Sequence, residues 1–178
     1  MAQIGWGKCS VYVCDLSAAQ VKWEKLPTPM EGTTQLSVTK GTKSEAKIEG
    51  GENEDVRYGA NTYALAYQIR KAKGRTAVIS HIDGVVAHNY AVVVVPEDPA
   101  VPSGLYIPLS AVSVEDAFST TDGGTDLYTH DALKPTDGGK QVKWGAIAVT
   151  ETAGEISEIK GTGGDFQAAG EEIYKKNS

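Results

Sequence analysis

Apolar and polar residues alternate along much of this chain of 178 residues. The clearest case is 62–71, where one face collects Tyr63, Leu65, Tyr67 and Ile69 and the other collects small or polar residues. A period of two is typical of a β-strand that buries one face. The same pattern predicts shorter strands at 10–15, 21–26, 33–39 and 44–49. The first half of the chain is therefore expected to be built of strands.

The second half continues the pattern with six further predicted strands, at 76–81, 85–95, 105–107, 112–118, 127–133 and 141–149. We expect 112–118 and 127–133 to form a hairpin, because Asp122, Gly123 and Gly124 between them favour the positive φ of tight turns. So many short strands at regular spacing favour a mostly-β fold. The expected architecture is an antiparallel β-sandwich or open barrel of two packed sheets, with at most one or two short helices.

Helical patterns are confined to two segments. Residues 110–119 fit a short helix or a strand equally well. Residues 165–175 predict a short helix, because Asp165 is an N-cap candidate and Phe166, Ala169 and Ile173 follow at helical spacing. Residues 151–164 are expected to be a flexible arm. The predicted organisation is a β domain over 1–150 followed by a C-terminal arm over 151–178.

The segment 42–61 stands out between two strands. It carries four acids in the seven residues from Glu49 to Asp55, together with three glycines. Loops this long without structure of their own usually bind something or stay disordered. We expect its flanks, 44–49 and 62–71, to pair as one long hairpin. The flexible tip then shrinks to 50–59.

Composition narrows the range of partners. The net charge is −6 and the pI about 5.1. Such a surface does not retain nucleic acid, because phosphate binding needs clustered Lys and Arg. The sequence shows no secretory signal pattern and no apolar run long enough for a transmembrane helix, so no membrane partner is expected. Cys9 and Cys14 fall on opposite faces of one strand and are expected to be free thiols.

No motif for catalysis or cofactor binding is present. His81, His88 and His130 have no metal-ligand spacing, and neighbouring residues such as Ser80, His81 and Asp83 do not converge as a triad must. The acidic stretch lacks the alternating oxygen ligands of a calcium loop. The glycine-rich 161–164 has no following Lys-Ser/Thr for phosphate. We therefore expect no enzyme, no metal and no cofactor.

The order of segments resembles the major tail tube proteins of long-tailed bacteriophages and prophages. The resemblance covers about residues 1–150. It rests on GWGKCSVYVCDL, VKWEKLPTP, QLSVTKGTKSEAKIEGGENEDVRYGANTYALAYQIRKA, HNYAVVVVPEDP and DALKPTDGGKQVKWGAIAV. The last 28 residues, 151–178, are less similar.

The resemblance implies a structural virion protein. Six copies would close into a ring whose inner sheets form a continuous barrel, and stacked rings would form a tube through which DNA passes without specific binding. The loop 42–61 would reach the next ring. The residues expected to make that contact are Glu49, Gly50, Gly51, Glu52, Asn53, Glu54, Asp55, Arg57, Tyr58 and Gly59. Glu45 and Glu49, on one predicted strand face, are candidates for lumen-facing acids, because a like-charged wall lets DNA slide.

The same resemblance implies partners and location. The partners would be further copies of the chain, a tape-measure protein and a tail terminator. The protein would be made and assembled in the cytoplasm of a bacterial host and end in the virion tail. Two alternatives stay open: a non-enzymatic β-sandwich binding or adhesion module, and a small enzyme on a β scaffold.

Overall fold

Strands make up the regular structure of the protein. The computed structural model describes residue 2 and residues 4–177. All elements of regular secondary structure in that range are strands. No described residue belongs to a helix of the kind that could cross a membrane. The strands form a branched ten-stranded sheet and a two-stranded sheet, and all pairings are antiparallel. The expectation of a mostly-β, antiparallel architecture is confirmed.

Twelve strands follow one another along the described chain. They are β1 (Ser10–Asp15), β2 (Trp23–Lys25), β3 (Gln35–Thr39), β4 (Lys43–Lys47), β5 (Asn53–Tyr58), β6 (Thr62–Arg70), β7 (Tyr90–Val95), β8 (Gly104–Ser119), β9 (Gly123–Ala132), β10 (Lys143–Thr152), β11 (Glu155–Thr162) and β12 (Glu171–Lys175).

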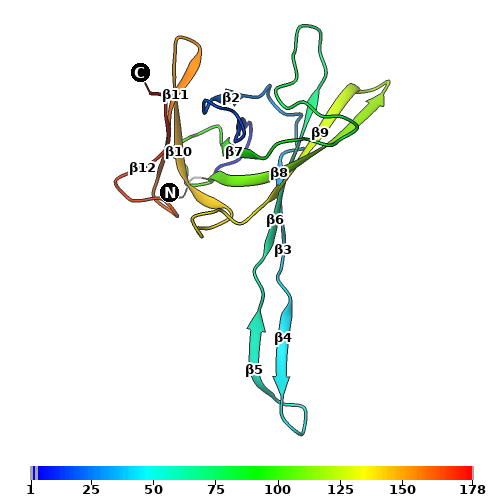
Figure 1. Cartoon of the computed structure of the whole chain (residues 1–178), viewed down its shortest axis with the longest axis vertical. Coiled ribbons are helices and arrows are strands. Elements are labelled where there is room, and N and C mark those ends of the chain that lie inside the picture. Colours follow the sequence, from blue (N-terminus) through cyan, green and yellow to red (C-terminus); the bar gives the residue numbers. More distant parts are fainter. Residues whose placement is uncertain (1, 3, 178) are drawn as a thin grey trace.

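The sheet branches at the long strand β8. Its first half pairs with β7 on one edge and with the start of β10 on the other, and its second half pairs with β9. The sheet then continues in three directions: through β9 to β6 and β3, through β7 to β1 and β2, and through β10 to β11 and β12. Figure 1 shows these branches folded around one another to form the body.

Strand β7 lies at the centre of the body and all six of its residues are buried. Val92 and Val94 belong to a core shared with β6, β8 and β9, whereas Val93 and Val95 belong to a second core shared with β10 and β11. A strand covered on both faces needs apolar residues at every position, which explains the unbroken sequence YAVVVV. β1 divides in the same way, since Val11 and Val13 face the first core and Tyr12 and Cys14 the second.

Several strand predictions are confirmed. β8 and β9 pair from Ser110 to Ala132 across a turn at 120–122, as the Asp-Gly-Gly sequence predicted, and Gly123 after the turn has a positive φ. The ambiguous 110–119 is strand. Leu65, Tyr67 and Ile69 of β6 are buried together. Cys9 and Cys14 are free thiols in different cores.

Other strand predictions are wrong. Of the predicted strand 85–95 only Tyr90–Val95 forms. The predicted strand 76–81 is irregular chain leading to a tight turn at 82–85, where Ile82 and Val85 exchange backbone hydrogen bonds of 3.0 and 2.9 Å. Asp83 and Gly84 both have positive φ, and the Asp-Gly pair therefore makes a turn that interrupts the predicted run of strands.

The predictions for the C-terminal residues are also wrong. Residues expected as a flexible arm complete β10 and form β11, and the expected helix over 165–175 is a loop followed by β12. Burial of the Phe166 side chain explains why this segment is a loop and not a helix. Its ring lies over Gly145 and Gly161, where any Cβ would overlap it, and it is 5% exposed. Asp165 accepts a hydrogen bond from the Trp144 N–H (2.9 Å) instead of capping a helix.

Candidate functional site

A long hairpin arm projects from the body. β3 and β4 run outwards, β5 and β6 return, and the pair β4–β5 extends away from every other strand (Figure 1). We call residues 43–58 the arm. It coincides with most of the segment 42–61 that the sequence singled out. It is an ordered two-stranded ribbon instead of a loop.

The pairing inside the arm differs from the predicted one. We expected 44–49 to pair with 62–71, but β4 pairs with β5, and β6 pairs with β3. The ribbon turns at 48–52, where Gly50 and Gly51 have φ of 98° and 85°. These conformations are accessible to glycine and strained for other residues, so the Gly-Gly pair fixes the tip. The expected flexible tip 50–59 is thus a turn followed by a strand.

A glycine joint connects the arm to the body. The Gly59 N–H donates to the Thr42 carbonyl (2.8 Å), and the Gly41 N–H donates to Asn61 Oδ1 (3.1 Å). A Cβ at Gly41 would overlap the Gly59 carbonyl oxygen. The outgoing and returning backbone segments therefore approach closely at the joint only because residue 41 is glycine.

The arm buries almost nothing. All of its residues are exposed except Val56, which is half-buried. Ile48 and Tyr58 are 47% and 58% exposed. Isolated two-stranded ribbons are marginal in water, and an apolar residue at their tip gains nothing there. The arm therefore contributes little to the stability of a single copy.

The predicted contact residues all lie on the arm or at its joint. Glu49, Gly50, Gly51 and Glu52 form the turn, Asn53, Glu54, Asp55, Arg57 and Tyr58 belong to β5, and Gly59 is in the joint. The candidate lumen acids do not share a strand face, because β4 ends before Glu49. Glu45 is ion-paired to Lys43 and Lys47.

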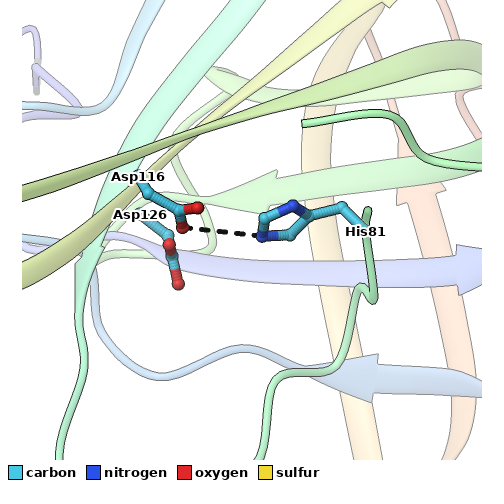
Figure 2. A group of neighbouring side chains, drawn as sticks. All are labelled: His81, Asp116 and Asp126. Atoms are coloured by element: carbon cyan, nitrogen blue, oxygen red, sulfur yellow. Dashed lines mark ion pairs between the residues drawn. The ribbon is translucent and has the colours of Figure 1, made fainter. Parts of the chain in front are cut away.

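A second cluster was not found by sequence reasoning. His81, Asp116 and Asp126 come from three separate segments and point towards one another (Figure 2). Asp116 and Asp126 are directly paired on β8 and β9. Lys71 Nζ lies 3.2 Å from Asp116 and 3.4 Å from Asp126, and His81 Nε2 lies 3.6 Å from Asp116. The pairing of β8 with β9 brings the two aspartates together, and the bridge between Val85 and Ser113 places His81 near them. The cluster therefore has no local sequence motif.

The geometry does not favour His81 as a metal ligand. Its Nδ1 accepts a hydrogen bond from the Gly84 N–H (3.1 Å), which places the ring proton on Nε2, directed at Asp116. A metal-bound histidine uses one ring nitrogen for the metal and donates a proton from the other. Here the second nitrogen is an acceptor. The cluster is therefore a charge network in which Lys71 neutralises a carboxylate pair.

The two carboxyl groups are shifted in opposite directions. Burial, followed by the hydrogen bond to Asp116, raises the pKa of Asp126. The hydrogen bond from Asp126, followed by the one from Lys71, lowers the pKa of Asp116. Two facing carboxylates repel each other, and the Lys71 ammonium, 3.2 and 3.4 Å from them, offsets that repulsion. Lys71 is thus held in place on this surface and is not a free cation.

A buried serine–histidine pair is also present. Ser110 Oγ lies 3.0 Å from His130 Nδ1, but both residues are 0% exposed. The Ser110 hydroxyl donates to the Tyr90 carbonyl (2.7 Å), so its proton is already engaged. A nucleophile must be reachable by substrate and must give its proton to the base. This pair does neither and serves to satisfy polar groups in the core.

The chain matches no protein-family model and no curated protein. The candidate site therefore rests on the geometry of the arm.

Proposed function

We propose that the protein is a structural subunit that assembles with copies of itself through the arm. The observation that carries this proposal is a sixteen-residue ribbon, residues 43–58, that leaves the body and is exposed on both faces. An ordered ribbon that stabilises nothing within its own chain is suited to burial against another chain.

The shape favours one mode of assembly. An arm on one side of the body meets a different surface on the next copy, so the interface is heterologous. Such interfaces close into rings or continue as open filaments. Rings that stack through the arm would form a tube.

The kind of tube that we propose is a bacteriophage or prophage tail tube. Support comes from the sequence resemblance over residues 1–150 and from the place of the arm, which lies where that family's inter-ring loop is expected. Ring symmetry would be six, and DNA would pass along an acidic channel without binding. Tape-measure and tail-terminator proteins would be further partners, and the virion tail would be the final location.

Removing the arm tests the proposal. Residues 43–58 are replaced by Asn-Gly, which links Thr42 to Gly59 with a two-residue hairpin turn. The shortened protein should fold with a stability within about 0.5 kcal/mol of wild type, since the removed residues are exposed. Wild type at high concentration should form rings or tubes in negative-stain images, and the shortened protein should form none. Ser44→Ala, which keeps the ribbon, is the control. A wild-type protein that stays monomeric across concentration and salt would refute the proposal.

A binding module is the second candidate, and one observation favours it. Trp6 and Trp144, which are 82% and 39% exposed, both line a cavity of about 840 Å³ beside the first core. Exposed aromatic rings beside an apolar cavity are common in ligand sites. Trp6→Ala would then abolish binding of a ligand without affecting assembly.

A further inference from the structure

The two ends of β6 lead to two different features of the molecule. The arm precedes Thr62, at one end of this strand, and a basic segment begins at Arg70, at the other end. The segment 70–75 reads RKAKGR. Figure 1 shows the arm and the segment that follows β6 at opposite ends of the longest axis.

The tip of the arm combines acids with one apolar side chain. Ile48 opens the turn and is 47% exposed. Glu49, Glu52 and Glu54 surround the turn, and none of them is ion-paired among the described residues. The tip therefore presents uncompensated negative charge around an exposed isoleucine.

The opposite end presents the complementary surface. A cavity of about 300 Å³ opens there, and its apolar wall includes Leu26, Ile69 and Val78. Arg70, Lys71 and Arg75 also line it. Asp126 lies in the wall as well, but it is ion-paired to Lys71.

Existing ion pairs show which cations are free to meet a partner. Arg70 is paired to Asp122 at 3.1 Å, and Lys71 is held by Asp116 and Asp126. The Arg75 side chain donates to the Arg70 carbonyl (3.0 Å) and is in no ion pair among the described residues. Lys73, which follows Ala72 of the cavity lining but is not itself part of it, is exposed and is likewise in no ion pair among these residues. Arg75 and Lys73 are therefore the cations available for docking.

We propose that the tip of the arm of one copy docks into this cavity of the next copy. Ile48 enters the apolar part, and Glu49 and Glu52 meet Arg75 and Lys73. This inference rests on the proposed function and specifies its contact. Because donor and receiver lie at opposite ends of one molecule, each copy is joined to another at both ends, and the contact propagates along the assembly axis.

Charge reversal tests the contact. The first variant is E49K/E52K, which makes the tip basic, and the second is K73E/R75E, which makes the receiving surface acidic. Each variant alone places like charges opposite one another, so each should raise the critical concentration for assembly by about tenfold or more. All four residues are exposed. Far-ultraviolet circular dichroism and thermal melting should confirm that both variants fold.

Mixing the two variants gives the decisive measurement. In an equimolar mixture the basic tip of one variant faces the acidic cavity of the other, and the reverse contact is also complementary. The mixture should therefore assemble at a concentration where neither variant does, as measured by sedimentation and negative stain. E97K/E151K, which reverses two exposed carboxylates on the body, should assemble alone like wild type.

The outcomes separate this inference from the proposed function. If wild type assembles and both variants assemble equally well alone, the docking contact is wrong and the assembly proposal stands. If each variant is blocked and the mixture is not rescued, the tip does not meet this cavity, and the inference is again overturned. If wild type never assembles, the proposed function itself fails.

Discussion

The hydroxyl of Tyr67 lies 2.8 Å from Nε2 of His130, at the centre of the first core. Ser110 completes the set on the other side of the ring, 3.0 Å from Nδ1. Since the Ser110 proton is donated to the Tyr90 carbonyl, Nδ1 carries the imidazole proton and donates it to Ser110. Nε2 then accepts from Tyr67. Both ring nitrogens of this histidine are hydrogen-bonded in its neutral form, and a second ring proton, on Nε2, would displace the hydrogen bond that Tyr67 donates.

The first prediction is a loss of stability in mild acid. Burial lowers the pKa of His130 from 6.5 to about 3. The unfolded chain therefore takes up a proton that the folded protein does not, and stability falls as the pH drops from 6.5 towards 3. Stability is unaffected by this group above pH 6.5. The loss should reach a few kcal/mol, on the order of 1.4 kcal/mol for each pH unit that separates the folded and unfolded pKa values. Chemical denaturation at a series of pH values measures it.

His130→Gln is the matched variant for that measurement. Glutamine keeps one donor and one acceptor but does not titrate, so its stability should change less between pH 6.5 and 3 than that of wild type. His88, half exposed beside Asp15, supplies the control variant His88→Gln, which should retain the acid sensitivity of wild type. An unchanged pH profile in His130→Gln would show that other groups cause the acid loss.

The second prediction concerns the two thiols. Cys14 is 1% exposed in the second core, and burial raises the pKa of its thiol. Cys9 is half-buried at the edge of the first core. Because only an accessible thiolate reacts readily, iodoacetamide should modify Cys9 in the folded protein and leave Cys14 intact until unfolding. Mass spectrometry of digested protein gives the ratio. Equal labelling would mean that the strand opens locally.

The third prediction is that the carboxylate cluster does not take up a metal. In nitrogen-edited spectra His81 should show the tautomer protonated at Nε2, because Gly84 donates to Nδ1. Addition of Mn²⁺ at micromolar concentration should leave the His81 ring signals unbroadened. Lys71→Met removes the cation between Asp116 and Asp126. If Mn²⁺ broadens the His81 signals only in this variant, Lys71 is the group that keeps the metal from the two carboxylates in wild type. Broadening in wild type would show that the cluster takes up the metal and would contradict this prediction.

Sequence periodicity was sufficient for the strands that bury one face. β6 and the β8–β9 hairpin follow directly from alternation and an Asp-Gly-Gly turn, and these strands supply half of the buried residues of the first core. The charge and the glycines of the arm predicted its place in the chain, but the predicted pairing of its strands was wrong. A period of two assigns faces but not partners, so it does not distinguish β4–β5 pairing from β4–β6 pairing.

The remaining failures have the same physical origin. The carboxylate cluster joins residues 81, 116 and 126, and the buried network joins residues 67, 110 and 130. Both depend on strand partners that are distant in sequence. At the C-terminal end, Phe166, Ala169 and Ile173 do recur at helical spacing, but the ring of Phe166 gains more by covering two glycines of a neighbouring hairpin. Tertiary burial outweighs a local pattern of a few tenths of a kcal/mol per residue.

The fourth prediction tests that last interaction. Phe166→Ala should destabilise the protein by about 3–5 kcal/mol, since it removes a buried ring from the second core. Gly161→Ala should cost about 1–3 kcal/mol, because the new methyl group overlaps the same ring. The double variant should lose less than the sum, since the alanine at 161 no longer meets the ring. Ala169→Gly is the control. In a helix it would cost about 1 kcal/mol, whereas in the exposed turn that the structure shows it should change stability by less than about 0.5 kcal/mol. Additive losses for Phe166 and Gly161 would mean that the two residues do not touch.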